Sequence, residues 1–260
     1  MTFDAMVTAG GIPQPGESLY EFSQGRSKAL IDVAGKPMAQ WVLDALSGAS
    51  SVGRVVIVGL DESSGLKCSK PLAYVPNQGG MLDNIRAGAR KIAELNPKAE
   101  YALIVSSDLP TITAAMVDWV CAQVHPGQDD AVYNVIQREV MERRFPNSKR
   151  TYAKLRDMEV CGGDINPASV PLILSHAGPW ERIADARKSP VKQAGLIGFD
   201  TLLLFLMRAL TLEQAAARVS RRLGLRARGV VCPYAEVGMD VDKLHHLEIV
   251  RRDLAAKAKP

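Results

Sequence analysis

The first 135 residues alternate between short apolar runs and segments with a helical period. Apolar runs bounded by turn residues predict strands at Asp4–Ala9, Arg54–Leu60, Leu72–Val75, Tyr101–Ser106 and Asp130–Val135. Apolar residues spaced three and four positions apart predict helices at Met38–Leu46, Met81–Leu95 and Ala114–Val124, the last with Thr113 as its N-cap. Because strands and helices alternate, the pattern predicts a three-layer α/β/α fold with a mostly parallel sheet.

Beyond residue 140 the pattern loosens and helices dominate. Strands are predicted at Glu159–Gly162 and Gly229–Cys232. Helices are predicted at Pro167–Ser175, Pro179–Lys188, Phe199–Ala209, Leu212–Leu223 (with Thr211 as its N-cap) and Val241–Ala255, followed by a frayed tail at Ala256–Pro260. We expect a single domain over residues 1–260, with a helical insertion at about residues 175–225. Within it Leu202–Met207 is apolar nearly all round, which indicates a buried core helix or an exposed oligomer- or lipid-facing surface.

Composition narrows the class of protein. The chain has 260 residues, 47% of them hydrophobic, and a net charge of +4, which suits a globular domain with a sizeable core. The basic residues are dispersed, so nothing indicates a nucleic-acid binder. The densest cluster, between Arg218 and Arg228, indicates a solvated helix face or a patch for an anionic substrate or a membrane surface. The four cysteines show no C-x-x-C spacing, and neither a secretory leader nor a membrane-length apolar run is visible. We expect a cytoplasmic monomer or homodimer.

The turn after the first strand carries the first candidate chemistry. Gly10 and Gly11 let the backbone approach a ligand closely, and backbone N–H groups in such a turn can face an anion. A polar loop follows, and then Lys28 and Lys36, whose ammonium groups suit phosphate oxygens. Neither a Walker P-loop nor a Rossmann glycine pattern is present. The stretch predicts a loop that wraps a phosphate-bearing ligand.

A carboxylate follows the predicted strand at Tyr101–Ser106. Asp108 begins the sequence Asp-Leu-Pro, at the carboxyl end of a strand, where ligands bind in open α/β sheets. Magnesium favours one or two carboxylates together with phosphate oxygens and water. Asp108 is therefore a candidate metal ligand, and the alternative is a carboxylate that caps the following turn or helix.

These motifs resemble those of the nucleotidyltransferases with a glycosyltransferase-A-like fold, which include sugar-1-phosphate nucleotidylyltransferases and the guanylyl- and cytidylyltransferases of molybdenum cofactor. The matching stretches are Ala9-Gly10-Gly11, Lys28-Ala-Leu, Gly35-Lys36-Pro37-Met38 and the Asp-x-Pro that starts at Asp108. The family usually has Gly-x-Gly-Thr/Ser-Arg directly after the two glycines, whereas this chain has Ile12–Gln24 there, and Arg26 is the substitute candidate. The resemblance covers residues 1–135 and, more loosely, Gly162–Asn166 and the end from Gly238.

The resemblance implies transfer of NMP from an NTP to a phosphorylated acceptor, a sugar-1-phosphate or a molybdopterin-like compound, with release of pyrophosphate. It implies Mg²⁺, with Mn²⁺ as an alternative, held by Asp108 and by Asp242, with Asp240 as a second choice for the late ligand. The competing interpretation of Asp242 is a simple N-cap of the last helix. Lys28, Lys36 and Asp108 are the implied catalytic residues.

The resemblance also implies that different segments of the chain bind the nucleotide, the acceptor and the metal ion. Residues 1–135 bind the nucleotide, 136–235 face the acceptor, and 236–260 supply the late metal ligand and the closing helix. The implied nucleotide-binding residues are Ala9, Gly10, Gly11, Arg26, Asn77, Gly79 and Gly80, although the Asn77 stretch also fits a plain turn. The implied acceptor-binding residues are Lys149, Arg150, Gly163, Asp164 and Asn166.

Two alternatives remain open. A glycosyltransferase of the same fold would use a nucleotide-sugar, but it usually shows Asp-x-Asp after the strand where this chain has Asp108-Leu-Pro110. A catalytically inactive nucleotide-binding protein is the other alternative, because the loop at residues 12–25 departs from the family pattern.

Overall fold

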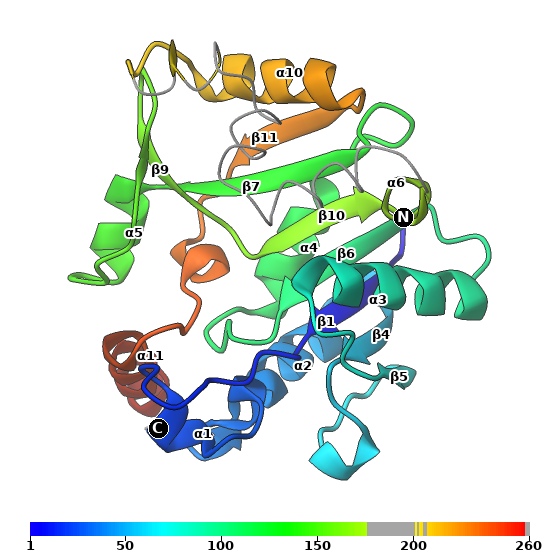
Figure 1. Cartoon of the computed structure of the whole chain (residues 1–260), viewed down its shortest axis with the longest axis vertical. Helices are drawn as coiled ribbons and strands as arrows, with labels where there is room; N and C mark the ends of the chain where they lie inside the picture. The colour runs from blue at the N-terminus through cyan, green and yellow to red at the C-terminus, as the bar shows by residue number, and fades with distance from the viewer. Residues whose placement is uncertain (176–200, 202, 205–206, 258–260) are drawn as a thin grey trace.

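The computed structural model describes residues 1–175, 201, 203–204 and 207–257, and it contains a nine-stranded sheet with the order β5-β4-β1-β6-β10-β7-β9-β8, in which β11 pairs with β7 (Figure 1). The strands are β1 (Phe3–Thr8), β4 (Val52–Val58), β5 (Leu72–Val75), β6 (Tyr101–Ser106), β7 (Ala131–Gln137), β8 (Ala153–Lys154), β9 (Glu159–Gly162), β10 (Ile165–Ser169) and β11 (Ala227–Val231). A separate ribbon joins β2 (Asp32–Val33) to β3 (Lys36–Pro37). Of these nine strands, β9 and β10 run against the others, so the sheet is mixed but mostly parallel.

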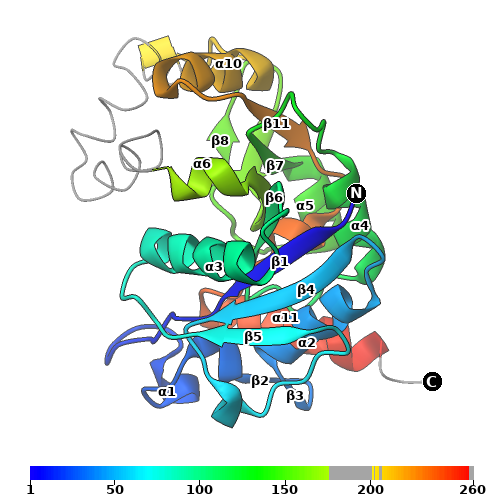
Figure 2. The same ribbon diagram turned by 90° about the vertical axis from the view of Figure 1, so that its right-hand side faces the viewer.

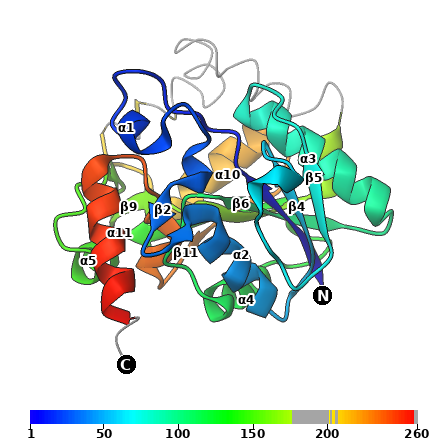
Figure 3. The ribbon, with the colours of Figure 1, turned by 90° about the horizontal axis from the view of Figure 1, so that it is seen from below.

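Helices cover both faces of the sheet. The described α-helices are α1 (Tyr20–Ser23), α2 (Met38–Gly48), α3 (Met81–Leu95), α4 (Ala114–Ala122), α5 (Arg138–Arg144), α6 (Val170–Leu174), α10 (Leu212–Leu223) and α11 (Leu244–Lys257), and the 3₁₀ turns are η1 (Lys28–Leu30), η2 (Glu62–Ser64) and η3 (Ala235–Gly238). Figure 2 shows α3 and α6 on one side of the sheet, and Figure 3 shows α2, α4 and α11 on the other.

The alternation of side chains along β1 builds a core on each face. Ala5 and Val7 join the larger core, which includes the buried faces of α2, α4 and α11. Met6 points the other way and packs with Ile85 and Ala89 of α3. A strand with apolar residues on both faces is what a sheet covered on both sides requires.

The last helix, α11, lies beside the segment around α1 at the lower left of Figure 1. The backbone N–H of Leu244, at the start of α11, donates to Ser18 Oγ at 2.8 Å. Farther along α11, Arg251 Nη2 donates to the carbonyl of Asp32 at 2.6 Å. The last helix therefore packs against the loop and ribbon that follow β1.

Strongly periodic segments match their predicted bounds. Leu72–Val75, Met81–Leu95, Tyr101–Ser106, Glu159–Gly162 and Leu212–Leu223 agree residue for residue. Thr211 forms a capping box with Gln214, as its position at the start of α10 predicts. Thr113 is the N-cap residue of α4, as predicted, although its side chain makes no capping hydrogen bond.

The prediction of a helix from Pro167 is wrong. Ile165–Ser169 is the strand β10, which pairs antiparallel with β6, and the helix starts at Val170 with Pro171 in its first turn. Proline suits the first turn of a helix because its missing N–H needs no partner there.

The closing helix begins at Leu244 rather than at the predicted Val241. The charged stretch at 138–156, for which no element was predicted, contains α5 and β8.

Several predictions fall wholly or partly outside the described residues. They are the helix at Pro179–Lys188, most of the helix at Phe199–Ala209 with the apolar run Leu202–Met207, much of the insertion at 175–225, and the last residues of the tail. In the part of the chain that the structure describes, no helix combines the length and the apolar character needed to cross a membrane. All four cysteines are free.

Asp118 on α4 ties that helix to the turn before β4, and this contact allows a prediction about stability. Its carboxylate accepts hydrogen bonds from the backbone and hydroxyl groups of Ser50 and Ser51, at 2.5 to 3.1 Å. Burial raises the pKa of Asp118, but the bonds from Ser51 and Ser50 outweigh it and lower the pKa to about 2. A depressed folded-state pKa contributes stability that is complete above the unfolded-state pKa and is lost as the pH falls.

We expect Asp118→Asn to lower the free energy of unfolding at pH 7 by about 1–2 kcal/mol, since an amide replaces a charged acceptor. The difference from the wild type should shrink as the pH falls from 5 towards 2, because the wild-type carboxylate becomes protonated there. Urea unfolding at several pH values measures both effects. Asp157→Asn, at an exposed position, is the control, and a difference that does not depend on pH would contradict the prediction.

Candidate active site

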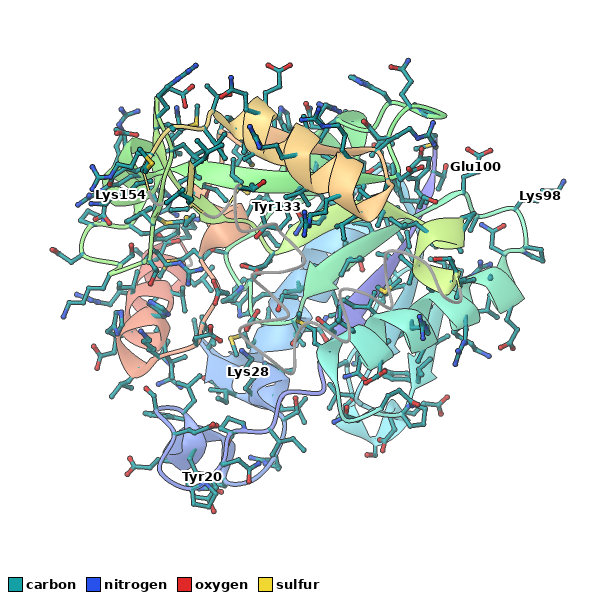
Figure 4. All side chains as sticks on the ribbon, turned by 45° about the horizontal axis from the view of Figure 1, so that its top comes forward. Tyr20, Lys28, Lys98, Glu100, Tyr133 and Lys154 are labelled. Carbon is teal, nitrogen blue, oxygen red and sulfur yellow. The ribbon has the colours of Figure 1, made fainter. Side chains whose placement is uncertain are left out.

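A lysine and three carboxylates form one cluster beyond the carboxyl end of β6. Lys28 Nζ forms an ion pair with Asp108 and lies 2.7 Å from Asp242 Oδ1. Asp240 completes the cluster, since one carboxylate oxygen from each of Asp108, Asp240 and Asp242 lies within 4.8 Å of the others. Figure 4 shows Lys28 near the middle of the molecule, far from Lys98 and Lys154 at its edges. The structure thus brings together side chains that are more than 200 residues apart along the chain.

Backbone hydrogen bonds fix the members of the cluster. The N–H of Val241, between Asp240 and Asp242, donates to the carbonyl of Asp108 at 3.0 Å. Ser106 Oγ donates to Asp108 Oδ1. The segment 240–242 is therefore attached directly to the end of β6.

The loop after β1 is pinned at both ends, and this carries Lys28 into the cluster. Ser27 Oγ donates to the carbonyl of Ala9 at 2.6 Å. The N–H of Lys28 donates to the carbonyl of Gly11 at 2.9 Å. The loop at residues 12–25, called the atypical loop below, therefore begins and ends beside the turn that follows β1.

Arg150 supplies a second cation to the cluster. Its guanidinium forms an ion pair with Asp240 and donates to the backbone carbonyl of Asp240 at 3.5 Å. Asp240 Oδ1 is buried and accepts no hydrogen bond of good geometry from a described residue. Each carboxylate therefore has an internal positive partner, Lys28 for two of them and Arg150 for the third.

The charges act strongly on one another. Burial alone would lower the pKa of Lys28, but Asp108 and Asp242 raise it well above its ordinary value. Burial and the charge of Asp108 raise the pKa of Asp240, against the opposing effect of Arg150. Burial raises the pKa of Asp242, but hydrogen bonds to Asp240 and Lys28 lower it to about 2. At neutral pH, Lys28 and Asp242 therefore face each other in their charged forms.

The cluster fits a divalent metal ion. Three carboxylates provide hard oxygen ligands at short mutual distance, which is the donor type that Mg²⁺ and Mn²⁺ prefer. The buried Oδ1 of Asp240 is in contact with the Arg150 guanidinium, and the ammonium of Lys28 lies between Asp108 and Asp242, so the cluster already accepts positive charge at two places. The competing interpretation of Asp242 is an N-cap of the last helix. Because α11 begins at Leu244, the residue directly before it is Lys243, whereas Asp242 pairs with Lys28.

Two cavities meet at this cluster. One, of about 450 Å³, is lined by Gly11, by residues 12–13 and 17–19 of the atypical loop, and by Lys28, Asp242 and Lys243. The other, of about 270 Å³, is lined by residues 149–151 and 161–162 and by Asp164, Asp240, Asp242, Lys243 and His246. Asp242 and Lys243 are the residues that line both cavities.

The loop before α3 closes on the glycine turn. Asn77 Nδ2 donates to the carbonyl of Gly10 at 3.0 Å, while Asn77 Oδ1 accepts from the N–H of Gly79 and from Asn84 Nδ2. Gly59, with φ of +105°, lies so close that a Cβ there would be 2.4 Å from Gly10 Cα. Glycine is required at that position both by its backbone conformation and by the contact.

Among the predicted acceptor residues the structure distinguishes three arrangements. Asp164 lines the smaller cavity, and burial and the charges of Asp240 and Asp108 raise the pKa of its carboxyl. Lys149 is exposed at the same cavity. Asn166 and Gly163 are used inside the sheet instead, since Asn166 Nδ2 donates to the carbonyl of Gly163 and its Oδ1 accepts from the N–H of Asn134.

Two predicted phosphate-binding cations are not in the cluster. Lys36 Nζ pairs with Asp44 at 2.7 Å and lies 4.4 Å from the centre of the Trp41 ring, both on α2. The structure therefore does not bring Lys36 to the carboxylates, and the catalytic role of Lys36 stays a prediction. Arg26 is exposed in the loop ahead of Lys28 and does not line either cavity.

Comparison with known proteins now identifies the family. The model of the MobA-like NTP transferase domain matches residues 21–227. The chain belongs to this family. A solved hypothetical transferase from Thermus thermophilus is 34% identical over 95% of this chain and 100% of that one, with a TM-score of 0.81. No protein among those with a curated description matches the sequence.

More distant solved structures share the fold. A CMP:2-keto-3-deoxy-manno-octonic acid synthetase complexed with CTP is 16% identical with a TM-score of 0.58, covering 99% of this chain and 100% of that one. The 4-diphosphocytidyl-2C-methyl-D-erythritol synthase of Anaerococcus prevotii is 13% identical with a TM-score of 0.59, covering 97% and 96%. This MobA-like domain therefore has the nucleotide-diphospho-sugar transferase, or glycosyltransferase-A-like, fold that the sequence predicted.

Sequence reasoning missed two residues of the MobA-like domain's cluster. His246 Nδ1 accepts from the N–H of Asp242 at 3.4 Å, so Nε2 carries the proton and donates to the carbonyl of Ser148 at 3.0 Å. His246 thereby joins the segment of Asp242 to the turn that precedes Arg150. Lys243 was overlooked although it directly follows Asp242, and that position was the available signal.

The contact between Gly10 and Asn77 gives a prediction for nucleotide binding. In Gly10→Ala the added methyl would lie 2.7 Å from Asn77 Oδ1 and 2.8 Å from Asn84 Nδ2. Because Asn84 is buried, we expect Asn77 and its loop to move outward and the affinity for NTP to fall by about tenfold, or 1.4 kcal/mol. Calorimetric titration measures the change. In the Gly10→Ala background, Asn77→Ala should cause little further loss, and equal affinity of Gly10→Ala and the wild type would contradict the prediction.

Proposed function

We propose that this domain transfers a nucleoside monophosphate from an NTP to a small phosphorylated acceptor and releases pyrophosphate. The observation that carries the proposal is the cluster of Lys28, Asp108, Asp240 and Asp242 at the junction of two cavities. A reaction that joins two phosphate-bearing molecules needs two binding spaces with charge neutralisation between them. Membership of the MobA-like NTP transferase family supports the same reaction class.

In this proposal the nucleotide occupies the larger cavity. The turn at Gly10 and Gly11 and the neighbouring loop from Asn77 to Gly80 hold the nucleoside beside this cavity. The side-chain amide of Asn77 fixes the glycine turn, since its Nδ2 donates to the carbonyl of Gly10 and its Oδ1 accepts from Gly79 and Asn84. Lys28 neutralises the triphosphate. The backbone of Ala9 bonds to Val58 and Ser27 rather than to the ligand, since its N–H donates to the carbonyl of Val58 and its carbonyl accepts from Ser27 Oγ.

The acceptor occupies the smaller cavity, beside Lys149, Arg150 and Asp164. A lone pair of an acceptor phosphate oxygen forms the new bond to the α-phosphorus. The bond between the α-phosphorus and the bridging oxygen breaks, and its electron pair leaves with pyrophosphate. Negative charge spreads over the phosphoryl oxygens during this displacement, so positioning and charge stabilisation supply most of the catalysis.

Asp108, Asp242 and Asp240 would hold Mg²⁺ or Mn²⁺. The ion, when bound, supplies charge stabilisation and orientation for the phosphates. The protein's own contribution is to fix the three carboxylates through Val241, Ser106 and Arg150, and to keep Lys28 charged.

The test is pyrophosphate release with Mg²⁺ or Mn²⁺, using each NTP against a panel of sugar-1-phosphates and molybdopterin-type acceptors. Turnover with one pair, abolished in Asp108→Asn, would support the proposal and name the substrates. A nucleotide-sugar panel on the same enzyme tests the glycosyltransferase alternative. Tight NTP binding without turnover across the whole panel would overturn the proposal in favour of a nucleotide-binding protein.

A further inference from the structure

The cations around the two cavities differ in how they are engaged. Lys28 lines the larger cavity and is held between Asp108 and Asp242. Arg150 lines the smaller cavity and is held by Asp240. Lys149 lines the smaller cavity and not the larger one. The remaining cation, Lys243, lines both.

The backbone of Lys243 is fixed while its side chain is exposed. Its carbonyl accepts the first hydrogen bond of α11, from the N–H of Leu247 at 3.1 Å. The next residue, Leu244, donates its N–H to Ser18 Oγ, which lies in the loop that lines the larger cavity. Among the residues that the structure describes, none forms an ion pair with the Lys243 ammonium. The ammonium of Lys243 thus has no ion-pair partner among the described residues, while its backbone, directly after Asp242, is held by hydrogen bonds.

The position of Lys243 matches the place where the new bond must form. The attacking phosphate oxygen lies in one cavity and the α-phosphorus in the other, so the bond forms across their junction. A cation at that junction can contact oxygens of both groups and offset the repulsion between them, an effect that grows as the two approach each other. The start of α11 adds the partial positive charge of a helix N-terminus to the same place.

We propose that Lys243 is a catalytic residue that contacts both the α-phosphate of the nucleotide and the phosphate of the acceptor during transfer. The inference rests on the proposed nucleotidyl transfer and adds a residue to it. Lys243 neither gives nor takes a proton in this step. It stabilises negative charge while the acceptor oxygen binds to phosphorus and pyrophosphate departs.

The test compares steady-state kinetics of lysine variants with the best NTP and acceptor. We expect Lys243→Met to lower kcat by about 10²-fold, the size of effect typical for loss of one charge-stabilising donor, and to leave the KM for NTP nearly unchanged. Lys243→Arg should recover part of the loss. Lys149→Met should instead raise the KM for the acceptor. Lys98→Met, at an exposed position far from the cluster, is the matched control and should behave like the wild type (Figure 4).

The outcomes separate the two proposals. If the wild type turns over no pair, the nucleotidyl-transfer proposal fails and Lys243 loses its role with it. If the wild type turns over but Lys243→Met keeps its kcat, only the inference about Lys243 is overturned. A loss confined to the KM for NTP would also overturn it, because that is the result of uniform binding. Thermal melting of each variant confirms that the exposed substitution leaves the fold intact.

Discussion

Asp108→Asn is expected to lower kcat for pyrophosphate release by about 10³-fold, the largest effect of any substitution considered, because this residue meets both the lysine and the other carboxylates. Asparagine keeps the shape of the side chain but removes the charge that pairs with Lys28. It also weakens the three-carboxylate donor set for a divalent ion. The backbone carbonyl of Asp108, which accepts from Val241, remains in place, so the segment 240–242 should stay attached.

The measurement for Asp108→Asn has two parts. Steady-state kinetics gives the loss of kcat, and the paramagnetic signal of free Mn²⁺ gives the loss of metal binding in the presence of NTP. Asp44→Asn removes an exposed carboxylate that pairs with Lys36 and should change neither quantity. Unchanged turnover by Asp108→Asn would contradict the assignment of the cluster.

Lys28→Met is expected to lower kcat by about 10²- to 10³-fold. Unlike Asp108→Asn, it should strengthen the binding of a metal ion rather than weaken it. The ammonium lies between Asp108 and Asp242, so in the free protein it fills part of the space that a divalent ion would use. Without it the two carboxylates lack their internal cation, and Mn²⁺ should bind to the nucleotide-free protein about tenfold more tightly, a pattern that simple unfolding would not produce.

The comparison variant is Lys36→Met, because both lysines were predicted from the same sequence stretch. The structure gives Lys36 a partner on α2 instead, so this variant should keep most of its activity and its metal affinity. Equal losses in the two variants would show that the lysines act together and that the contact between Lys36 and Asp44 gives way during the reaction.

The fold was predictable where local pattern and packing agree. The segment Met81–Leu95 has a full helical period and ends where predicted, and Tyr101–Ser106 is apolar on both faces because helices cover both faces of the sheet. The strand β10 was missed because Pro167 lacks a backbone donor and reads as a helix start, whereas tertiary pairing with β6 determines its conformation.

The site was predictable in part, through Asp108 at the end of a strand and through resemblance for Lys28 and Asp242. No local pattern shows which cations are already paired. Asp44, eight residues beyond Lys36, holds that lysine on α2, and Asp240 holds Arg150 from 90 residues away. The sequence therefore named basic residues of the right kind but could not tell the engaged ones from Lys243.

The ion pair between Lys28 and Asp242 joins positions 214 residues apart. Contacts of such sequence separation form late, because a long loop must close before the contact offsets the lost entropy. A ribosome-bound chain that ends before residue 240 holds Lys28 and Asp108 but neither Asp240 nor Asp242, so during synthesis the cluster can be completed only after nearly the whole polypeptide has emerged. The proposed active site is therefore completed last: a chain truncated before Asp240 can retain the core between β1 and α3 and still lack the carboxylate cluster.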